Sequence, residues 1–179
     1  MATASSAGLR TGPGALRWYL LAHVVVVLDQ YTKGLASRAR DYGRPVEIFF
    51  WFDLTLHHNT GAAFSFLNDA GGWQRWLFSG VAISISAALV VWLYTLPRGQ
   101  WLLALGLALI LGGAIGNLWD RLALGYVVDF ISVHYGGWYF PAFNVADSAI
   151  TVGAACMLYD SFFITGDDKP KREEKATDG

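Results

Sequence analysis

Trp76–Leu96 (WLFSGVAISISAALVVWLYTL) and Gly99–Trp119 (GQWLLALGLALILGGAIGNLW) are two stretches of 21 residues, and neither contains a charged side chain. A helix rises about 1.5 Å per residue, so about 20 apolar residues cross the roughly 30 Å of hydrocarbon in a bilayer. The hydrophobic fraction of 54% also exceeds the roughly 45–50% of soluble domains. The sequence therefore predicts a mainly α membrane protein in which both stretches span the bilayer.

Residues 16–37 and 148–166 are predicted to be two further spans, which completes a four-helix transmembrane bundle. They carry polar exceptions, Asp29 and Lys33 in the first and Asp160 in the last. Ionisable groups within a span normally face the bundle interior or lie near an interface. Asp29 and Lys33 are four residues apart and share a helix face, so a structural ion pair is one interpretation and a functional role is the other. Because the apolar start of the first span runs into Asp29 without a cleavage signature, we interpret it as a retained span and not as a removed signal sequence.

The distribution of Lys and Arg predicts the orientation of the bundle. Seven lie in the N-terminal tail, the turn at Pro97-Arg98 and the C-terminal tail, whereas the loop 38–75 holds four. This bias places both termini in the cytoplasm. We expect one integral-membrane domain over residues 15–166. The tails 1–14 and 167–179 are too polar or too small in side-chain size to bury a core, so we expect them to be disordered.

The loops 38–75 and 120–146 should then lie on the periplasmic side. Val46–Leu56 alternates in a period of two, as expected of a strand. Tyr126–Val133 is rich in β-branched and aromatic residues, and Gly136 and Gly137 follow it. The sequence predicts a small antiparallel β-sheet and a loop on the periplasmic face.

Asp129 and Asp147 are the leading candidates for chemistry. One follows the third predicted span and the other precedes the fourth, so both should lie at the outer end of the bundle. Two neighbouring carboxyl groups can share one proton, and the ionised one then activates water while the protonated one hydrogen-bonds a carbonyl. Alternatively, Asn144 and Asp147 are three residues apart before an apolar run and can simply begin the last helix. Both interpretations are compatible, and a helix N-terminus would favour the ionised form of Asp147.

Five segments, in this order along the chain, resemble the motifs of lipoprotein signal peptidase, also called signal peptidase II. They are DQYTK (29–33), NTGAAF (59–64), GNLWDR (116–121), VDF (128–130) and FNVADSAI (143–150). The resemblance covers residues 15–166. It implies an aspartic endopeptidase of the bacterial inner membrane, with Asp129 and Asp147 as catalytic residues and no cofactor. Its substrates would be diacylglyceryl-modified prolipoproteins, cut before the lipid-modified cysteine.

The same resemblance implies roles for residues around the two aspartates. Asn59 and Arg121 would bind the substrate backbone, and Asn144 would support the dyad. The remaining motif positions are those of Asp29, Lys33, Gly61, Asn117 and Asp120. We expect a monomer surrounded by membrane lipids.

Other classes of function are less favoured by the sequence. A net charge of −1 without a basic stripe argues against nucleic acid. His57 and His58 are adjacent on a predicted strand and point to opposite faces, with His134 remote, so no metal site is predicted. A proton- or ion-coupled transporter and a non-catalytic scaffold are the alternatives, although no internal repeat is visible. Gly112 and Gly116 are expected to serve helix packing, and the single Cys156 is expected to do the same.

Overall fold

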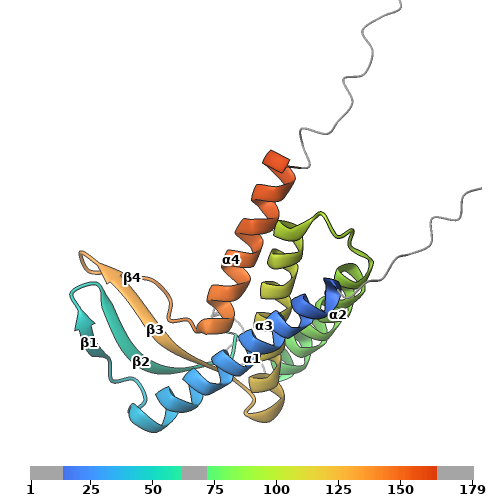
Figure 1. The fold of residues 1–179 in the computed structure, drawn as a ribbon. Coiled ribbons are helices and arrows are strands. Elements are labelled where there is room, and N and C mark those ends of the chain that lie inside the picture. Colours follow the sequence, from blue (N-terminus) through green and yellow to red (C-terminus); the bar gives the residue numbers. More distant parts are fainter. Residues whose placement is uncertain (1–13, 62–71, 165–179) are drawn as a thin grey trace, which may run out of the picture.

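A computed structural model describes residues 14–61 and 72–164, and Figure 1 shows their arrangement. Four helices are present in this part of the chain: α1 (Gly14–Ala39), α2 (Trp73–Thr95), α3 (Trp101–Ala123) and α4 (Val145–Tyr159), the last continued by the π-helix η2 (Asp160–Ile164). The strands are β1 (Val46–Phe49), β2 (Phe52–Asn59), β3 (Val127–Tyr135) and β4 (Trp138–Tyr139), and they form an antiparallel sheet in the order β1-β2-β3-β4. The predicted disordered tails lie outside the described residues, except that Gly14 begins α1.

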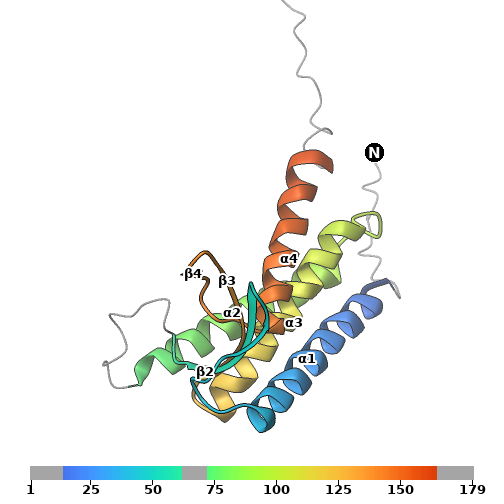
Figure 2. The same cartoon turned by 90° about the vertical axis from the view of Figure 1, so that its left-hand side faces the viewer.

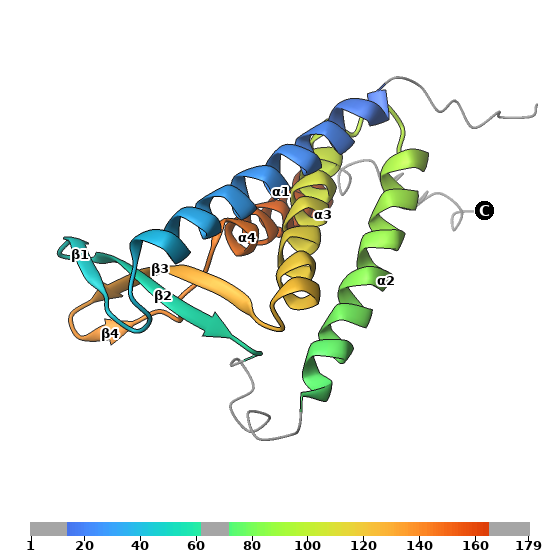
Figure 3. The same cartoon turned by 90° about the horizontal axis from the view of Figure 1, so that it is seen from below.

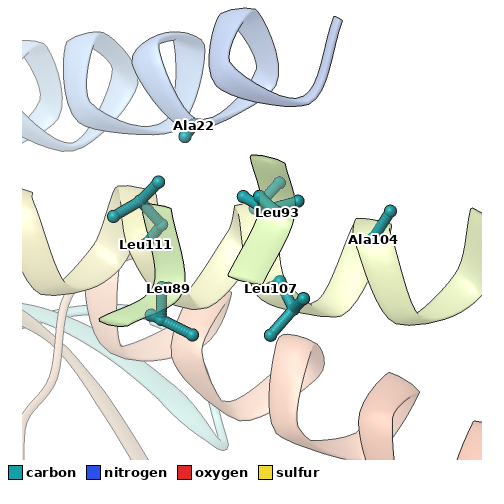
Figure 4. Close-up of a cluster of buried hydrophobic side chains, with 7 residues drawn as sticks. Ala22, Leu89, Leu93, Ala104, Leu107 and Leu111 are labelled. Carbon is teal, nitrogen blue, oxygen red and sulfur yellow. The ribbon is translucent and has the colours of Figure 1, made fainter. Parts of the chain in front are cut away.

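Helix α3 is the central element and packs against α1, α2 and α4. Leucine and alanine side chains from α1, α2 and α3 form the core cluster of Figure 4. Glycines bring α3 and α4 together, because a Cβ at Gly106 would lie 2.7 Å from the Gly153 carbonyl oxygen. On the α1 side of α3, a Cβ at Gly112 would lie 2.7 Å from the Ala22 carbonyl oxygen. The packing role predicted for Gly112 is therefore confirmed.

The surface of the helices is apolar and part of their interior is charged. Large apolar side chains such as Val27, Ile83 and Val91 are exposed, whereas Asp29 and Lys33 are buried. This is the reverse of a soluble bundle. Within the described part of the chain, α2 and α3 are the helices long and apolar enough to cross a membrane. The other two predicted spans stay predictions.

The sheet lies at the end of the bundle where α4 begins (Figures 1 and 2). Figure 3 shows it beside the C-terminal end of α1, whereas α2 lies on the other side of α3. The opposite end holds the start of α1 and the α2–α3 turn, where Gly14, Arg98 and Ala104 line one small cavity. All of the candidate catalytic side chains therefore lie toward the sheet end.

The helix boundaries differ from the predicted spans by up to four residues, and the sheet differs in one place. The single strand predicted over Val46–Leu56 is wrong, because β1 and β2 form a hairpin that turns at Phe50-Trp51. No Gly, Pro, Asn or Asp marks this turn, and the rings of Phe49 and Trp51 stack across it at 5.9 Å. Helix α4 begins at Val145, three residues before the predicted start at 148.

Candidate active site

Asn144 caps the first turn of α4. Its side-chain oxygen accepts a 2.9 Å hydrogen bond from the backbone N–H of Asp147, and its own backbone N–H donates to Asp147 Oδ2 at 3.3 Å. This reciprocal capping box satisfies N–H groups that have no partner within the helix. The interpretation that both residues begin the last helix is confirmed.

The same Asn144 side chain also contacts Asp129 on β3. Its Nδ2 donates to Asp129 Oδ1 at 2.7 Å, and the side chain is fully buried. Asn59, the last residue of β2, donates from Nδ2 to the other oxygen, Asp129 Oδ2, at 2.9 Å. One asparagine side chain thus joins the two candidate aspartates, and a second one holds Asp129 from the opposite oxygen.

Gly61 fixes the orientation of Asn59. The backbone N–H of Gly61 donates to Asn59 Oδ1 at 2.9 Å, which leaves the amide nitrogen of Asn59 directed at Asp129. Gly61 has a φ of 115°, which L side chains rarely adopt, and a Cβ there would lie 2.7 Å from Cε2 of Phe78. Glycine is therefore required at this position on both conformational and steric grounds.

Burial raises the pKa of the Asp129 carboxyl to about 6, well above its ordinary value of 3.8. The hydrogen bonds from Asn59 and Asn144 act in the opposite direction, and the negative charge of Asp147 raises the pKa further. A carboxyl with such a raised pKa keeps its proton to a higher pH than an ordinary one does.

Asp147 is held by Asn117 of α3, whose Nδ2 donates to Asp147 Oδ1 at 2.7 Å. The other end of this amide, Asn117 Oδ1, accepts from Lys33 Nζ at 3.0 Å and from Asn144 Nδ2 at 3.2 Å. Two donors at the oxygen leave the nitrogen to face Asp147. The orientation of the amide is thus determined by its partners.

Lys33 belongs to a buried charge cluster behind the site. Its Nζ lies 2.8 Å from Asp29 Oδ2 and 2.9 Å from Asp120 Oδ2, and all three side chains are at most 3% exposed. The backbone N–H of Ala146 donates to Asp29 Oδ1 at 2.9 Å, and that of Val128 donates to Asp120 Oδ2 at 3.1 Å. The predicted ion pair of Asp29 and Lys33 is present, but it is part of a larger group that ties α1 and α3 to β3 and α4.

Gln30 was missed as a contributor to this cluster. Its Nε2 donates to Asp120 Oδ1 at 2.8 Å and to the Gly116 carbonyl at 3.2 Å. A polar residue next to Asp29 within an apolar span is the signal that could have identified it. Gly116 is also more than a packing residue, because a Cβ there would lie 2.6 Å from Asp29 Oδ2.

Arg121 lies in the last turn of α3, beside the aspartates. Its Nη1 donates to the Asn117 carbonyl at 3.2 Å, and its guanidinium carbon lies 5.6 Å from the ring centroid of Phe78. Its charge interacts with Asp147 and Asp129. The substrate-binding roles predicted for Arg121 and Asn59 stay predictions.

The other residues considered in the sequence are the histidines of β2, where His57 lies opposite Asp129 in the sheet, and two residues of α4 and η2. His58 stacks on Tyr126 at 4.0 Å. Within residues 14–61 and 72–164, no three His, Cys, Asp or Glu side chains are grouped as metal ligands would be. Asp160 is buried, in agreement with the expectation that an ionisable group within a span faces the interior or lies near an interface. It begins η2, at the opposite end of α4 from Asp147. Cys156 is half-buried on α4.

Comparisons with known proteins identify the family to which the chain is similar. The family model described as "Signal peptidase (SPase) II" matches residues 21–163. The chain is similar to the lipoprotein signal peptidase of Teredinibacter turnerae, with 54% identity over 151 residues, covering 84% of this chain and 90% of the relative. It is 56% identical to that of Pseudomonas aeruginosa over 151 residues, with coverages of 83% and 89%. A solved structure of a bacterial membrane enzyme superposes with a TM-score of 0.76 at 31% identity, covering 88% of this chain and 94% of that one.

Proposed function

Because the chain belongs to the signal peptidase II family, we propose that it is an aspartic endopeptidase in which Asp129 and Asp147 form the catalytic dyad. Membership of the family makes it a peptidase that acts on prolipoproteins. The aspartic mechanism is the further step. The observation that supports the aspartic mechanism is the position of the Asn144 side chain. It donates a hydrogen bond to Asp129 at 2.7 Å and also caps the first turn of α4, which contains Asp147.

The dyad would carry a single proton, held by Asp129. Its pKa of about 6, raised by burial, favours the protonated form more than an ordinary carboxyl does. Asp147 lies in the first turn of α4, where the partial positive charge of the helix N-terminus favours a carboxylate. The environments of the two groups thus suit different roles, as acid–base catalysis requires.

Hydrolysis then follows from these two protonation states. The Asp147 carboxylate takes a proton from water as the oxygen attacks the peptide carbonyl, while Asp129 gives its proton to the carbonyl oxygen. When the tetrahedral intermediate collapses, the C–N bond breaks and the leaving amine receives the proton from Asp147. Asp129 regains its proton from the hydroxyl that becomes the new carboxyl group. No covalent enzyme intermediate is needed.

The substrate would be a prolipoprotein with a diacylglyceryl group on its cysteine, cut on the N-terminal side of that cysteine. Lipid anchoring places this bond near the membrane interface, and Asp147 lies in the first turn of α4 while Asp129 lies on β3. Arg121, beside both aspartates, would bind a carbonyl of the substrate backbone. Asn59, at the end of β2, would also bind the substrate backbone.

We propose that α1–α4 with η2 all span the bacterial inner membrane, with both termini in the cytoplasm and the sheet on the periplasmic side. The exposed apolar surface of all four helices supports this arrangement. The buried charges of α1 face α3 and α4, not lipid, as expected of ionisable groups within a span. A single membrane domain over residues 15–166, with disordered tails, would act as a monomer.

Cleavage of a purified, lipid-modified prolipoprotein tests the proposal. Asp129→Asn and Asp147→Asn are each expected to lower kcat by at least about 10³-fold, because each removes one of two groups that act as a unit. Asp41→Asn is a matched control, since Asp41 is exposed and lies outside the site. Cleavage undiminished in both dyad variants would exclude the mechanism, even if the protein remains a peptidase.

A further inference from the structure

His57 on β2 lies directly opposite Asp129 on β3, and the pairing of the two strands continues in step through His58 and Asn59. Side chains of directly opposite residues project from the same face of a sheet, with Cβ atoms about 4.5–5.5 Å apart. Asn59, two residues after His57, projects from this face as well and donates to Asp129 at 2.9 Å. The side chain of His57 therefore lies beside the dyad, on the face of the sheet that carries Asp129.

The three side chains on this face differ in exposure. Asp129 is buried and Asn59 is half-buried, whereas His57 is exposed. The imidazole of His57 makes an edge contact with the ring of Tyr42, with centroids 6.1 Å apart. An exposed imidazole can still form hydrogen bonds through its ring nitrogens. His57 thus belongs to the rim of the site, where a bound peptide can contact it.

The same face is apolar farther along the sheet. Ile131 and Val133 follow Asp129 at intervals of two and project from its face, and both are half-buried. Leu54 on β2, which is also half-buried, pairs with Ile131. These three side chains offer apolar contacts. Among the neighbours of Asp129 on this side, His57 is therefore the one that can bind a polar or charged side chain.

The direction of β2 indicates which part of a substrate meets His57. Asn59, at the end of the strand, pairs with Val127, which lies four residues after the end of α3 at Ala123. His57 lies two residues farther from α3 along the strand. In the membrane arrangement proposed above, the signal peptide lies beside the helices, and the chain after the cysteine leaves toward the sheet. An extended peptide advances about 3.3 Å per residue, so the residue that follows the cysteine comes within reach of the imidazole.

We propose that His57 contacts the side chain of the residue that follows the lipid-modified cysteine and sets the charge preference at that position of the substrate. The inference rests on the proposed function and adds a specificity residue to it. A neutral imidazole can donate or accept a hydrogen bond, so it tolerates several polar partners. A fixed charge in its place should favour the opposite charge on the substrate.

Charge substitution at His57 tests this role. The probes are two lipid-modified prolipoprotein peptides that differ only in the residue after the cysteine, which is Asp in one and Lys in the other. We measure kcat/KM for each peptide at neutral pH and compare the Asp-to-Lys ratio with that of the unaltered chain. Because exposed charges interact weakly, His57→Lys should raise this ratio by about 3-fold and His57→Glu should lower it by about 3-fold.

His58→Glu is the matched control. His58 is adjacent in sequence but points to the opposite face, where it stacks on Tyr126 with centroids 4.0 Å apart. The same charge introduced there should leave the ratio unchanged. A second pair of peptides, with Asp or Lys placed well beyond the cysteine, should show no dependence on the charge at position 57.

The ratio does not depend on the amount of folded enzyme, and the Lys and Glu variants of His57 each test the proposal alone. The same ratio in both variants as in the unaltered chain overturns it, as does an equal shift in His58→Glu. Absence of cleavage of both peptides by the unaltered chain would overturn the proposed function and this role of His57 with it. Undiminished cleavage by Asp129→Asn would contradict the dyad alone.

Discussion

Replacing Lys33 with methionine would keep the unbranched apolar stem of the side chain and remove its charge from the cluster behind the active site. Lys33 Nζ lies within 2.9 Å of both Asp29 and Asp120, and none of the three side chains is more than 3% exposed. Two buried carboxylates would then face each other without a cation. Removal of one partner of a buried ion pair costs about 3–5 kcal/mol, because the remaining charge is neither solvated nor paired.

The exposed pair of Arg44 and Asp41 provides the matched control. Its atoms are 3.6 Å apart and its side chains are 81% and 79% exposed. Water and salt screen such a pair, so Arg44→Met should change the free energy of unfolding by less than about 1 kcal/mol. The two substitutions remove the same charge from different surroundings.

Equilibrium unfolding in mixed micelles, followed by circular dichroism as denaturing detergent is added, measures the two free energies. Adding Asp29→Asn and Asp120→Asn to Lys33→Met removes the stranded charges and should recover part of the stability. The rate of prolipoprotein cleavage by Lys33→Met should fall by more than the loss of folded protein explains. Asn117 loses the Lys33 donor that orients its amide toward Asp147. A loss in Lys33→Met no larger than that in Arg44→Met would refute the reasoning.

Three more predictions concern the site and the packing around it. Asp129 has a pKa of about 6 in the folded protein, so it retains a proton that the unfolded chain loses near pH 4. The free energy of unfolding should therefore fall by up to about 3 kcal/mol as the pH rises from 4 to 6. Unfolding curves measured over a series of pH values should show this fall in the unaltered protein and not in Asp129→Asn. Asn144→Ser keeps a capping oxygen but loses the amide donor to Asp129, so kcat should fall at least about 10-fold while stability falls by only about 1–2 kcal/mol. Gly113→Ala would force a Cβ into the Ala146 carbonyl and should lower the unfolding temperature, whereas Gly80→Ala meets nothing within 4 Å and should not.

The features that depend on local sequence were predicted well. Trp76–Leu96 and Gly99–Trp119 lie within a few residues of α2 and α3, because an uninterrupted apolar run leaves few alternatives to a long helix. The capping of α4 by Asn144 and Asp147 was predicted from their spacing, although the predicted span began three residues after Val145. Lipoprotein signal peptidase relatives agree with the family that the motifs resembled.

The features that depend on tertiary contacts were not predictable. Lys33 meets Asp120 through the packing of α1 on α3, and periodicity alone pairs Lys33 only with Asp29. The hairpin at Phe50-Trp51 was missed because aromatic packing, not a turn residue, stabilises it.

Asn144 has a consequence for biosynthesis. Asn144 caps the final helix and donates a hydrogen bond to Asp129. The backbone N–H of Ala146, two residues later, donates a hydrogen bond to Asp29. A nascent chain without its last segment therefore lacks Asp147, the Asn144 amide that binds Asp129, and one of the two partners of Asp29, which keeps only Lys33. If Asp129 and Asp147 form the proposed dyad, the active arrangement can arise only when this last helix has formed.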